Sequence, residues 1–363
     1  MEPLTQGILG AIAVQSFARR EDQRLAAGLG FVAGTLADLD VLIRSDTDPL
    51  LFLDYHRHFT HSLIFIPFAA ALLALALGPL VAAWRRRRGG PPVGFATLWT
   101  WLAVAYGTHG LLDACTTYGT QLLWPFSDLR VAWHVVAVID PGLTLPAFGL
   151  MVLAWRRRSP HLGRAACAWV LLWLSFGLVQ RERAEALLIR LADQQGLGVL
   201  RGGPKPTLFN LLLWRGVWQS AEGLHVAALR PGWFGPDLVS AVASAPAFEL
   251  VAALPGLDPA STQARDVERF RKFSDDWLVA LPEAGNPLVG DLRYGLQPEE
   301  VGPLWAIRLD PGTPDRHVEY VSLRRVPPGT VSRFFAKVRG RDLVPLKALS
   351  PPATPGNAAA APP

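Results

Sequence analysis

Cysteine is scarce in this chain: only Cys115 and Cys167 occur among its 363 residues. Both stand alone inside apolar segments, which is typical of packing residues and gives no basis for a disulfide framework. The sequence also lacks a phosphate-binding loop, a dinucleotide fingerprint, a nucleophile elbow and zinc-finger spacing. No basic segment or cleavage site of small residues follows Met1, so we expect no secretory signal.

Charge is nearly absent from long stretches of the first 180 residues. Leu63 to Trp84 is a run of 22 residues without a charge, long enough as a helix to cross a hydrocarbon core of about 30 Å. The other apolar runs are Pro3 to Ala18, Leu25 to Ile43, Pro91 to Thr108, Val131 to Trp155, and Ala165 to Gln180. The sequence therefore predicts an α-helical integral membrane bundle of four to six helices, followed by a small α+β soluble domain.

Arginines gather in alternate connections between these runs. Three connections hold eleven of them: Arg19, Arg20, Arg24, Arg85, Arg86, Arg87, Arg88, Arg156, Arg157, Arg158 and Arg164. The positive-inside rule places such connections in the cytoplasm. The N-terminus, the loops near residues 55 and 125, and the C-terminal half are then expected on the external side. The net charge of +5 is mild, and we expect contact with membrane lipids and none with nucleic acid.

Ionisable residues lie at the external ends of the apolar runs, although a charge inside a bilayer costs about 2.5–3.5 kcal/mol. These residues are Asp38, Asp40, His56, His61, His109, Asp113 and His134. His109 and Asp113 are four residues apart, so on a helix they share one face and can hold one ion. The alternative for this pair is a hydrogen bond within one helix. The gathering of the whole set at one membrane face indicates a shared site.

The other spacings suit the ends of helices. Asp38 and Asp40 can point toward one centre from a fraying helix end. His56 and His61 are five residues apart, which suits a loop-to-helix junction in which Thr60 or Ser62 caps the next helix. A single His or Asp at a helix end is more often a cap or an interfacial group, and His58 and His161 fit that interpretation.

Four stretches in a fixed order, "DLD", "HRHFTHSL", "HGLLD" and "YGTQLLWPFS", resemble the YdjM family of bacterial inner-membrane, metal-dependent hydrolases. The resemblance covers about residues 1 to 155. It implies a metal site beside Arg57 that is made of Asp38, Asp40, His56, His61, His109 and Asp113. Gln6 stands where many members have His, so it is expected to be a weaker ligand or to hydrogen bond a ligand. His134 is expected beside the site.

Mixed His and Asp ligands suit Zn²⁺, with Mn²⁺ or Fe²⁺ as alternatives. We expect metal ligands at His56, His61, His109 and Asp113, and catalytic roles for Asp38, Asp40 and Arg57. Asp38 and Asp40 would be further ligands or a general base. Arg57 would hold a phosphate or a developing oxyanion. A site at headgroup depth suggests hydrolysis of a lipid-linked or phosphoester substrate by metal-activated water.

Two other functions fit the same residues. Intramembrane His and Asp residues also mark the ion paths of transporters and channels. Transporter sites, however, lie near the membrane midplane, often between internal repeats, and this sequence shows no repeat. The second alternative is a membrane-anchored scaffold in which a structural metal joins the helices.

The second half of the chain predicts a different architecture. Residues 181–199 predict a helix that connects the membrane domain, residues 1–180, to a soluble domain, residues 200–348. Strands are predicted at "LHVAAL", "DWLVAL", "LWAIRL" and "HVEYVSL", and an amphipathic helix at "ARDVERFRKFSDDW". The Pro- and Ala-rich residues 349–363 predict a disordered tail.

Overall fold

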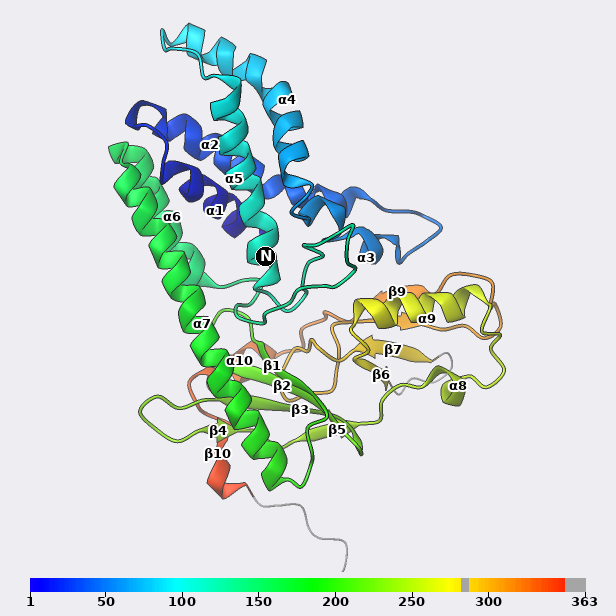
Figure 1. Ribbon diagram of the computed structural model, residues 1–363. Coiled ribbons are helices and arrows are strands. Elements are labelled where there is room, and N and C mark those ends of the chain that lie inside the picture. The colour runs from blue at the N-terminus through cyan, green and yellow to red at the C-terminus, as the bar shows by residue number, and fades with distance from the viewer. Residues whose placement is uncertain (282–286, 350–363) are drawn as a thin grey trace, which may run out of the picture. The chain divides into compact units, whose positions relative to one another are not determined.

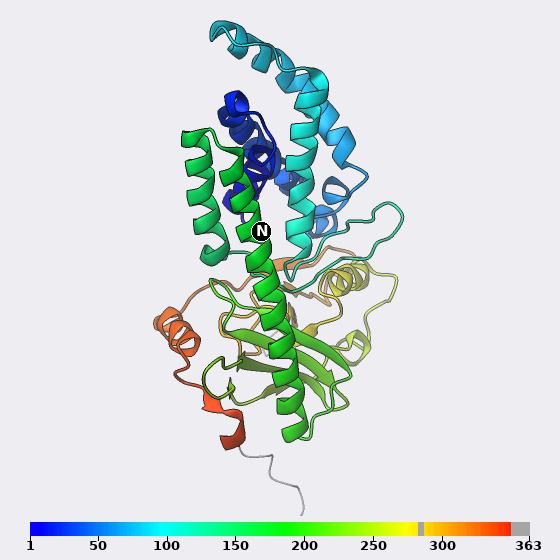
Figure 2. The same ribbon diagram turned by 60° about the vertical axis from the view of Figure 1, so that its left-hand side comes forward.

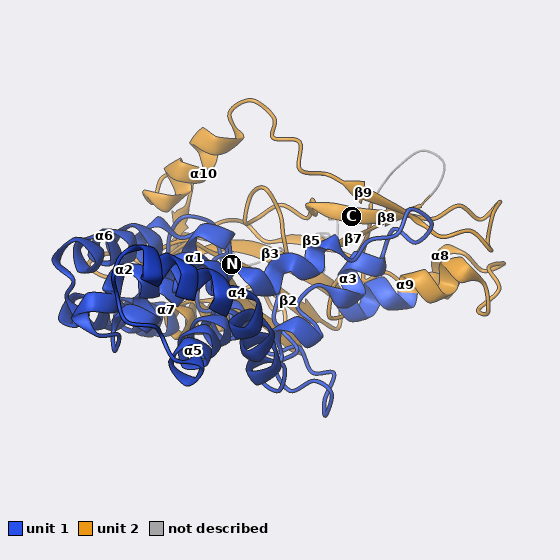
Figure 3. Ribbon diagram, turned by 90° about the horizontal axis from the view of Figure 1, so that it is seen from above, with its two compact units in different colours: residues 1–179, 206–211, 268–273 blue, residues 180–205, 212–267, 274–363 orange. Residues whose placement is uncertain are grey.

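The computed structural model describes residues 1–281 and 287–349. Apart from Leu349, the expected disordered tail lies outside the described residues. The chain divides into two compact units, coloured in Figure 3. Unit 1 comprises residues 1–179, 206–211 and 268–273, and unit 2 comprises residues 180–205, 212–267 and 274–363.

Unit 1 is helical (Figure 1). Its α-helices are α1 (Pro3–Gln15), α2 (Gln23–Thr35), α3 (Leu51–Tyr55), α4 (Ile66–Arg87), α5 (Phe95–Ala114) and α6 (Pro141–Arg157), with the first part of α7 (Pro160–Gln194). Three 3₁₀ segments join them: η1 (Arg20–Asp22), η2 (Leu36–Leu42) and η3 (Phe59–His61).

Three helical stretches of the described chain are long and apolar enough to cross a membrane. They are Arg20–Leu42, Ile66–Arg87 and Pro160–Gln194, of 23, 22 and 35 residues. The sequence predicted four to six spans. Helices α1 and α6 fall short of a full crossing, with 13 and 17 residues, and α5 is not among the three. The higher count stays a prediction.

Glycines let α1 and α2 approach closely. A Cβ added to Gly10 would lie 2.3 Å from the carbonyl oxygen of Gly30, and one added to Gly34 would lie 2.5 Å from that of Gln6. Gly30 and Gly34 are spaced four residues apart on α2, a spacing that brings membrane helices into backbone contact. This contact places Gln6 beside the end of α2, from which η2 continues with Asp38.

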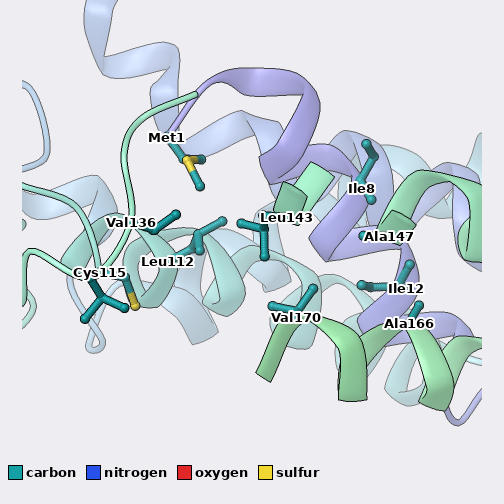
Figure 4. Packing of buried hydrophobic residues seen from close by; sticks show 11 residues of the cluster. Met1, Ile8, Ile12, Leu112, Cys115, Val136, Leu143, Ala147, Ala166 and Val170 are labelled. Atoms are coloured by element: carbon teal, nitrogen blue, oxygen red, sulfur yellow. The ribbon is translucent and has the colours of Figure 1, made fainter. Parts of the chain in front are cut away.

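A buried apolar cluster joins α1, α5, α6 and α7 (Figure 4). Its members include Ile8, Ile12, Leu112, Leu143, Ala147, Ala166 and Val170, all at most 6% exposed. The side chains come from helices that are distant in the sequence, and burying apolar surface stabilises their packing. The cluster therefore holds the last turns of α5 against α1, and those turns carry the site residues described below.

Two expected helix starts are wrong. The run that begins at Val131 becomes helical only at Pro141, because Asp140 caps α6 by accepting a hydrogen bond from the amide of Leu143 at 3.2 Å. His134 thus lies in a non-helical segment with a left-handed φ of 53°. Helix α4 begins at Ile66 without a side-chain cap, so neither Thr60 nor Ser62 caps it.

The apolar run near residue 165 and the charged run after residue 180 form one continuous helix, α7, of 35 residues. Figure 2 shows this helix in green along its full length. The helix is not interrupted between the two runs, since residues 178–194 contain neither Gly nor Pro and Gly177 is itself helical. The helix ends at Gln194, shortly before Gly196, which has a φ of 69°.

Unit 2 contains two antiparallel sheets, which confirms the strands of the predicted α+β domain. The first has the order β1 (Arg201–Pro206), β2 (Trp214–Ser220), β3 (Gly223–Arg230), β4 (Leu238–Val239), β10 (Val344–Pro345), with β5 (Ala243–Ala245) also on β3. The second has the order β6 (Leu278–Leu281), β7 (Leu288–Asp291), β8 (Trp305–Arg308), β9 (Glu319–Ser322). The remaining elements are α8 (Leu250–Ala253), α9 (Thr262–Phe273), whose residues 268–273 belong to unit 1, α10 (Thr330–Val338) and η4 (Leu346–Ala348).

Buried cations lie inside unit 2. Arg215 of β2 donates hydrogen bonds to four backbone carbonyls, those of Leu292, Gln297, Pro298 and Glu300. These bonds tie β2 to the segment that follows β7. Lys205 is also buried, and burial, reinforced by the charge of Arg293, lowers its pKa from 10.5 to about 7.

Candidate metal centre

Three separate segments of unit 1 bring together Asp38, His61, His109 and Asp113. Asp38 lies in η2, His61 ends η3, and His109 and Asp113 lie one turn apart near the end of α5. Gly110 makes room for the η3 backbone, because a Cβ there would lie 2.5 Å from the carbonyl oxygen of His61. The two imidazole rings consequently meet edge to face, with centroids 4.8 Å apart.

The Nε2 atoms of both histidines face the same two carboxylates. His61 Nε2 lies 3.5 Å from Asp38 Oδ1 and 3.3 Å from Asp113 Oδ2. His109 Nε2 lies 3.2 Å and 3.5 Å from the same two oxygens. One ligand atom from each residue falls within 4.8 Å of all the others. We call these four residues the His/Asp cluster.

The remaining ring nitrogens are held from outside the cluster. His61 Nδ1 lies 3.2 Å from Asp40 Oδ2 and 2.9 Å from Thr60 Oγ1. His109 Nδ1 lies 2.6 Å from the carbonyl oxygen of Gly34, which can only accept, so this nitrogen carries the proton. Such partners orient metal-binding imidazoles and hold the remaining proton on Nδ1 when a metal binds Nε2.

The atoms that face the centre of the cluster are buried without hydrogen bonds. His61 Nε2, His109 Nε2 and Asp113 Oδ2 all share this property. The side chains of these three residues are 0% exposed, whereas Asp38 is 18% exposed. Buried polar atoms left without hydrogen bonds are costly. Two imidazole nitrogens and two carboxylate oxygens are a donor set that suits a divalent cation such as Zn²⁺, so the residues present fit a metal.

Asp40 and His56 form the outer part of the site. Asp40 accepts hydrogen bonds from the Arg57 amide at 2.9 Å and from Thr60 Oγ1 at 3.0 Å. His56 Nδ1 lies 2.9 Å from Asp40 Oδ1. Asp38, Asp40 and His56 also make a second group with ligand atoms within 4.8 Å. The structure thus places His56 on Asp40, and Asp38 with His61 and His109.

Arg57 lies against the buried side of the cluster. Its Nε is 3.1 Å from Asp113 Oδ2, and its Nη1 donates to Thr116 Oγ1 at 2.9 Å. The guanidinium carbon lies 5.2 Å from the ring centroid of Tyr118. With 4% exposure, Arg57 neutralises Asp113 rather than facing solvent.

Gln6 contacts the cluster through Asp113, as one of its two predicted roles requires. Its Nε2 donates to Asp113 Oδ1 at 2.9 Å and to the His109 carbonyl at 3.3 Å. The amino group of Met1 donates to the same carboxylate. Oδ1 of Asp113 is therefore held by Gln6 and the Met1 amine, whereas Oδ2 faces Arg57 and the Nε2 atoms of the two histidines.

His61 lies outside the three candidate spans, and its ionisation bears on metal binding. Burial lowers the pKa of its imidazole, but Asp113, Asp38 and Asp40 raise it to about 10. A metal that binds Nε2 must therefore displace a proton.

Sequence reasoning reached some of the site and missed other parts. Among the described residues, His134 belongs to none of the groups of candidate metal-ligand atoms. The carbonyl of Gly34 was missed, because a backbone ligand partner leaves no side-chain signal. Thr60 and Thr116 were also missed, and their only signal was adjacency to His61 and a three-residue spacing from Asp113.

Comparisons with known proteins agree on the first half of the chain. The family model described as "YdjM inner membrane protein" matches residues 1–184. The "Inner membrane protein YbcI" of Escherichia coli (strain K12) is 32% identical over 152 residues, covering 36% of this chain and 82% of that protein. The "Uncharacterized protein YfhP" of Bacillus subtilis (strain 168) is 26% identical over 157 residues, covering 42% of this chain and 45% of that protein. No solved structure matches.

Proposed function

Because the chain belongs to the YdjM family of inner membrane proteins, we propose that it binds a divalent metal ion in the membrane through the His/Asp cluster. Asp38, His61, His109 and Asp113 are the proposed ligands. The observation that carries this proposal is that buried atoms without hydrogen bonds, both Nε2 atoms and Asp113 Oδ2, converge there. The outer partners on Asp40 and Gly34 support it.

The proposed reaction is hydrolysis. A metal of this class, when bound, polarises a phosphoryl or carbonyl oxygen and makes water a nucleophile near neutral pH. Asp38 is the partly exposed ligand, so substrate approaches from its side. Asp40 orients His61, and Arg57 holds Asp113 in place and neutralises it. The proposed substrate is a phosphoester or a lipid-linked molecule, because the site lies at the end of membrane helices.

One observation favours a second candidate function. Four protein ligands complete the coordination that structural zinc sites use, whereas catalytic sites keep a position open. The cluster contains residues of η2, η3 and α5, so a structural metal would cross-link these three segments of a scaffold protein. The two candidates differ at Asp38, since only a catalytic site needs this exposed ligand to leave room for substrate.

The proposed topology has four to six membrane helices, with α5 and the shorter α1 and α6 added to the three long stretches. The arginine-rich connections α1–α2, α4–α5 and α6–α7 lie toward one end of unit 1 (Figures 1 and 2). The His/Asp cluster lies at the other ends of α2 and α5. By the positive-inside rule, the cluster then faces the periplasm. A periplasmic location is also proposed for the residues after α7.

The first experiment is metal analysis of the detergent-purified full chain by inductively coupled plasma mass spectrometry. We expect near-stoichiometric zinc, manganese or iron in the wild type and a loss of that metal in His109→Ala. His58→Gln is the matched control, because His58 lies close to His61 in the chain but belongs to none of the groups of candidate ligand atoms. A folded wild-type protein without metal after purification in chelator-free buffer containing zinc would refute the proposal.

Hydrolysis is tested separately on chromogenic phosphomonoesters and phosphodiesters. Activity that is lost with chelator and restored by the metal supports the enzyme. Stoichiometric metal without activity on soluble or lipid-linked phosphoesters would favour a structural role for the metal.

A further inference from the structure

A groove lies between α2 and α6, which contact each other in unit 1. It has a volume of about 260 Å³. Its lining residues are Arg24, Ala27, Gly28, Phe31, Met151, Val152 and Trp155. The groove is distinct from the metal centre, since Arg24 lies in the first turn of α2 and Asp38 follows the last turn.

The groove is apolar along its length and cationic at one end. Phe31, Met151 and Val152 line the apolar part. At the other end the guanidinium carbon of Arg24 lies 4.7 Å from the ring centroid of Trp155. Both side chains are exposed. Tryptophan and arginine paired at the end of membrane helices are typical of the headgroup level of a bilayer.

The surroundings of Arg24 carry an excess of positive charge. The connections at this end of unit 1 and the helix ends beside them contain eleven arginines, and the acidic residues among them are Glu21 and Asp22. Asp22 already pairs with Arg85. An anion is therefore the complementary ligand for Arg24, because surface arginines attract anionic headgroups by about 1 kcal/mol each.

We propose that this groove is a binding site for an anionic phospholipid, with the headgroup phosphate on Arg24 and one acyl chain along Gly28, Phe31 and Val152. A phospholipid in the bilayer has its phosphate at headgroup level, where Arg24 and Trp155 are expected, and its acyl chains deeper, beside the apolar part of the groove. In the bilayer the acyl chain leaves hydrocarbon that is as apolar as the groove, so it contributes packing between the two helices, and the headgroup charge on Arg24 supplies the preference for an anionic lipid. Trp155 borders the headgroup end.

The test uses the full chain in detergent, titrated with phosphatidylglycerol or phosphatidylcholine and observed by native mass spectrometry. Gly28→Leu fills the groove, and a Cβ on Gly28 meets no atom within 4 Å, so the backbone need not move. Gly149→Leu is the matched control, because Gly149 has the same open space but lies outside the groove lining. Arg24→Gln removes the cation.

We expect the wild type to bind phosphatidylglycerol in preference to phosphatidylcholine. Arg24→Gln should weaken phosphatidylglycerol binding about fivefold and remove the preference. Gly28→Leu should weaken the binding of both lipids, and Gly149→Leu should leave both unchanged. Equal binding of the two lipids by the wild type would overturn the proposal. So would equal loss in the Gly28 and Gly149 variants, or competition by glycerol phosphate as effective as by the lipid.

Discussion

Asp38 contacts one ring nitrogen of His109, and the carbonyl of Gly34, one helical turn earlier in the chain, contacts the other. Oδ1 of Asp38 lies 3.2 Å from Nε2 of His109, and the carbonyl of Gly34 lies 2.6 Å from Nδ1 of the same ring. The junction of α2 and η2 thus contacts both nitrogens of His109. The Gly34 carbonyl orients the imidazole, and the Asp38 carboxylate faces its Nε2 atom. Because the α1–α2 contact at Gly34 positions this junction, the geometry of the cluster depends on helix packing as well as on its ligands.

Chelation should destabilise the protein. A metal held only by the folded state stabilises it by about 2.7 kcal/mol at a hundredfold excess over Kd. The unfolding temperature of the wild type should therefore fall with EDTA and rise again with added zinc. His109→Ala should show a low unfolding temperature that neither reagent changes. An EDTA effect of equal size in His109→Ala would contradict metal binding at this site.

Asp40→Asn should weaken metal binding without abolishing it. Asp40 contacts Nδ1 of His61, the ring nitrogen that does not face the cluster. Loss of such a partner typically costs about 10–100-fold in metal affinity. Asp38→Asn, which alters a proposed ligand, should cost more. Competition with a fluorescent zinc chelator measures both. If Asp40→Asn lost as much affinity as Asp38→Asn, Asp40 would be a ligand, as the sequence prediction allowed.

Gly110→Ala should destabilise unit 1. The new methyl group would lie 2.5 Å from the His61 carbonyl oxygen, so the η3 segment must move, and overpacking of this kind costs about 1–3 kcal/mol. Gly107→Ala on the same helix is the control, because its methyl group meets Ile66 Cδ1 at 3.4 Å. Thermal unfolding and metal content should both fall in the first variant only. Matching behaviour of the two variants would exclude a packing role for Gly110.

Arg57→Lys separates charge from geometry. The ammonium group keeps a positive charge near Asp113 but cannot reproduce the contacts to Asp113 and Thr116 together. We expect metal to be retained, and hydrolysis, if detected for the wild type, to fall at least tenfold, about 1.4 kcal/mol of transition-state stabilisation. Full activity in Arg57→Lys would limit the role of Arg57 to its charge.

Lys205→Met should stabilise the protein in a pH-dependent way. The unfolded amine binds a proton below about 10.5, whereas the folded amine does so only below about 7. Between these values the unfolded state binds more protons, so wild-type stability rises with pH. The gain in unfolding temperature from Lys205→Met should be largest at pH 7 or below and shrink toward pH 10. A gain that does not change with pH would show that the pKa of Lys205 is not lowered in the folded protein.

Some of the site could be predicted from the sequence because its signals are local. The four-residue spacing of His109 and Asp113 sets them on one face of α5. The uncharged run from Leu63 predicted α4, although that helix begins three residues later. The resemblance of the first half to a membrane family rests on short motifs, and the family match confirms it.

Other assignments depended on contacts between segments that lie far apart in the sequence. His56 and His61 are equivalent by residue type, and only the fold places His61 in the cluster and His56 on Asp40. Asp140 starts α6 later than the apolar run indicated and leaves His134 in a non-helical segment, so the position of His134 beside the site stays a prediction. The groove between α2 and α6 has no sequence signal, since it exists only where two helix surfaces meet.

The sequence by itself determined which segments are apolar enough to enter a membrane, at which of their ends the arginines gather, and where the His and Asp side chains of the proposed metal site stand in the chain. These properties follow from hydropathy, charge and helical period, which act over a few residues. The tertiary structure alone decided which four side chains converge and which atoms contact the Nδ1 atoms of the two histidines. That choice depends on close helix contacts at Gly34 and Gly110, where the absence of a side chain lets distant backbone approach.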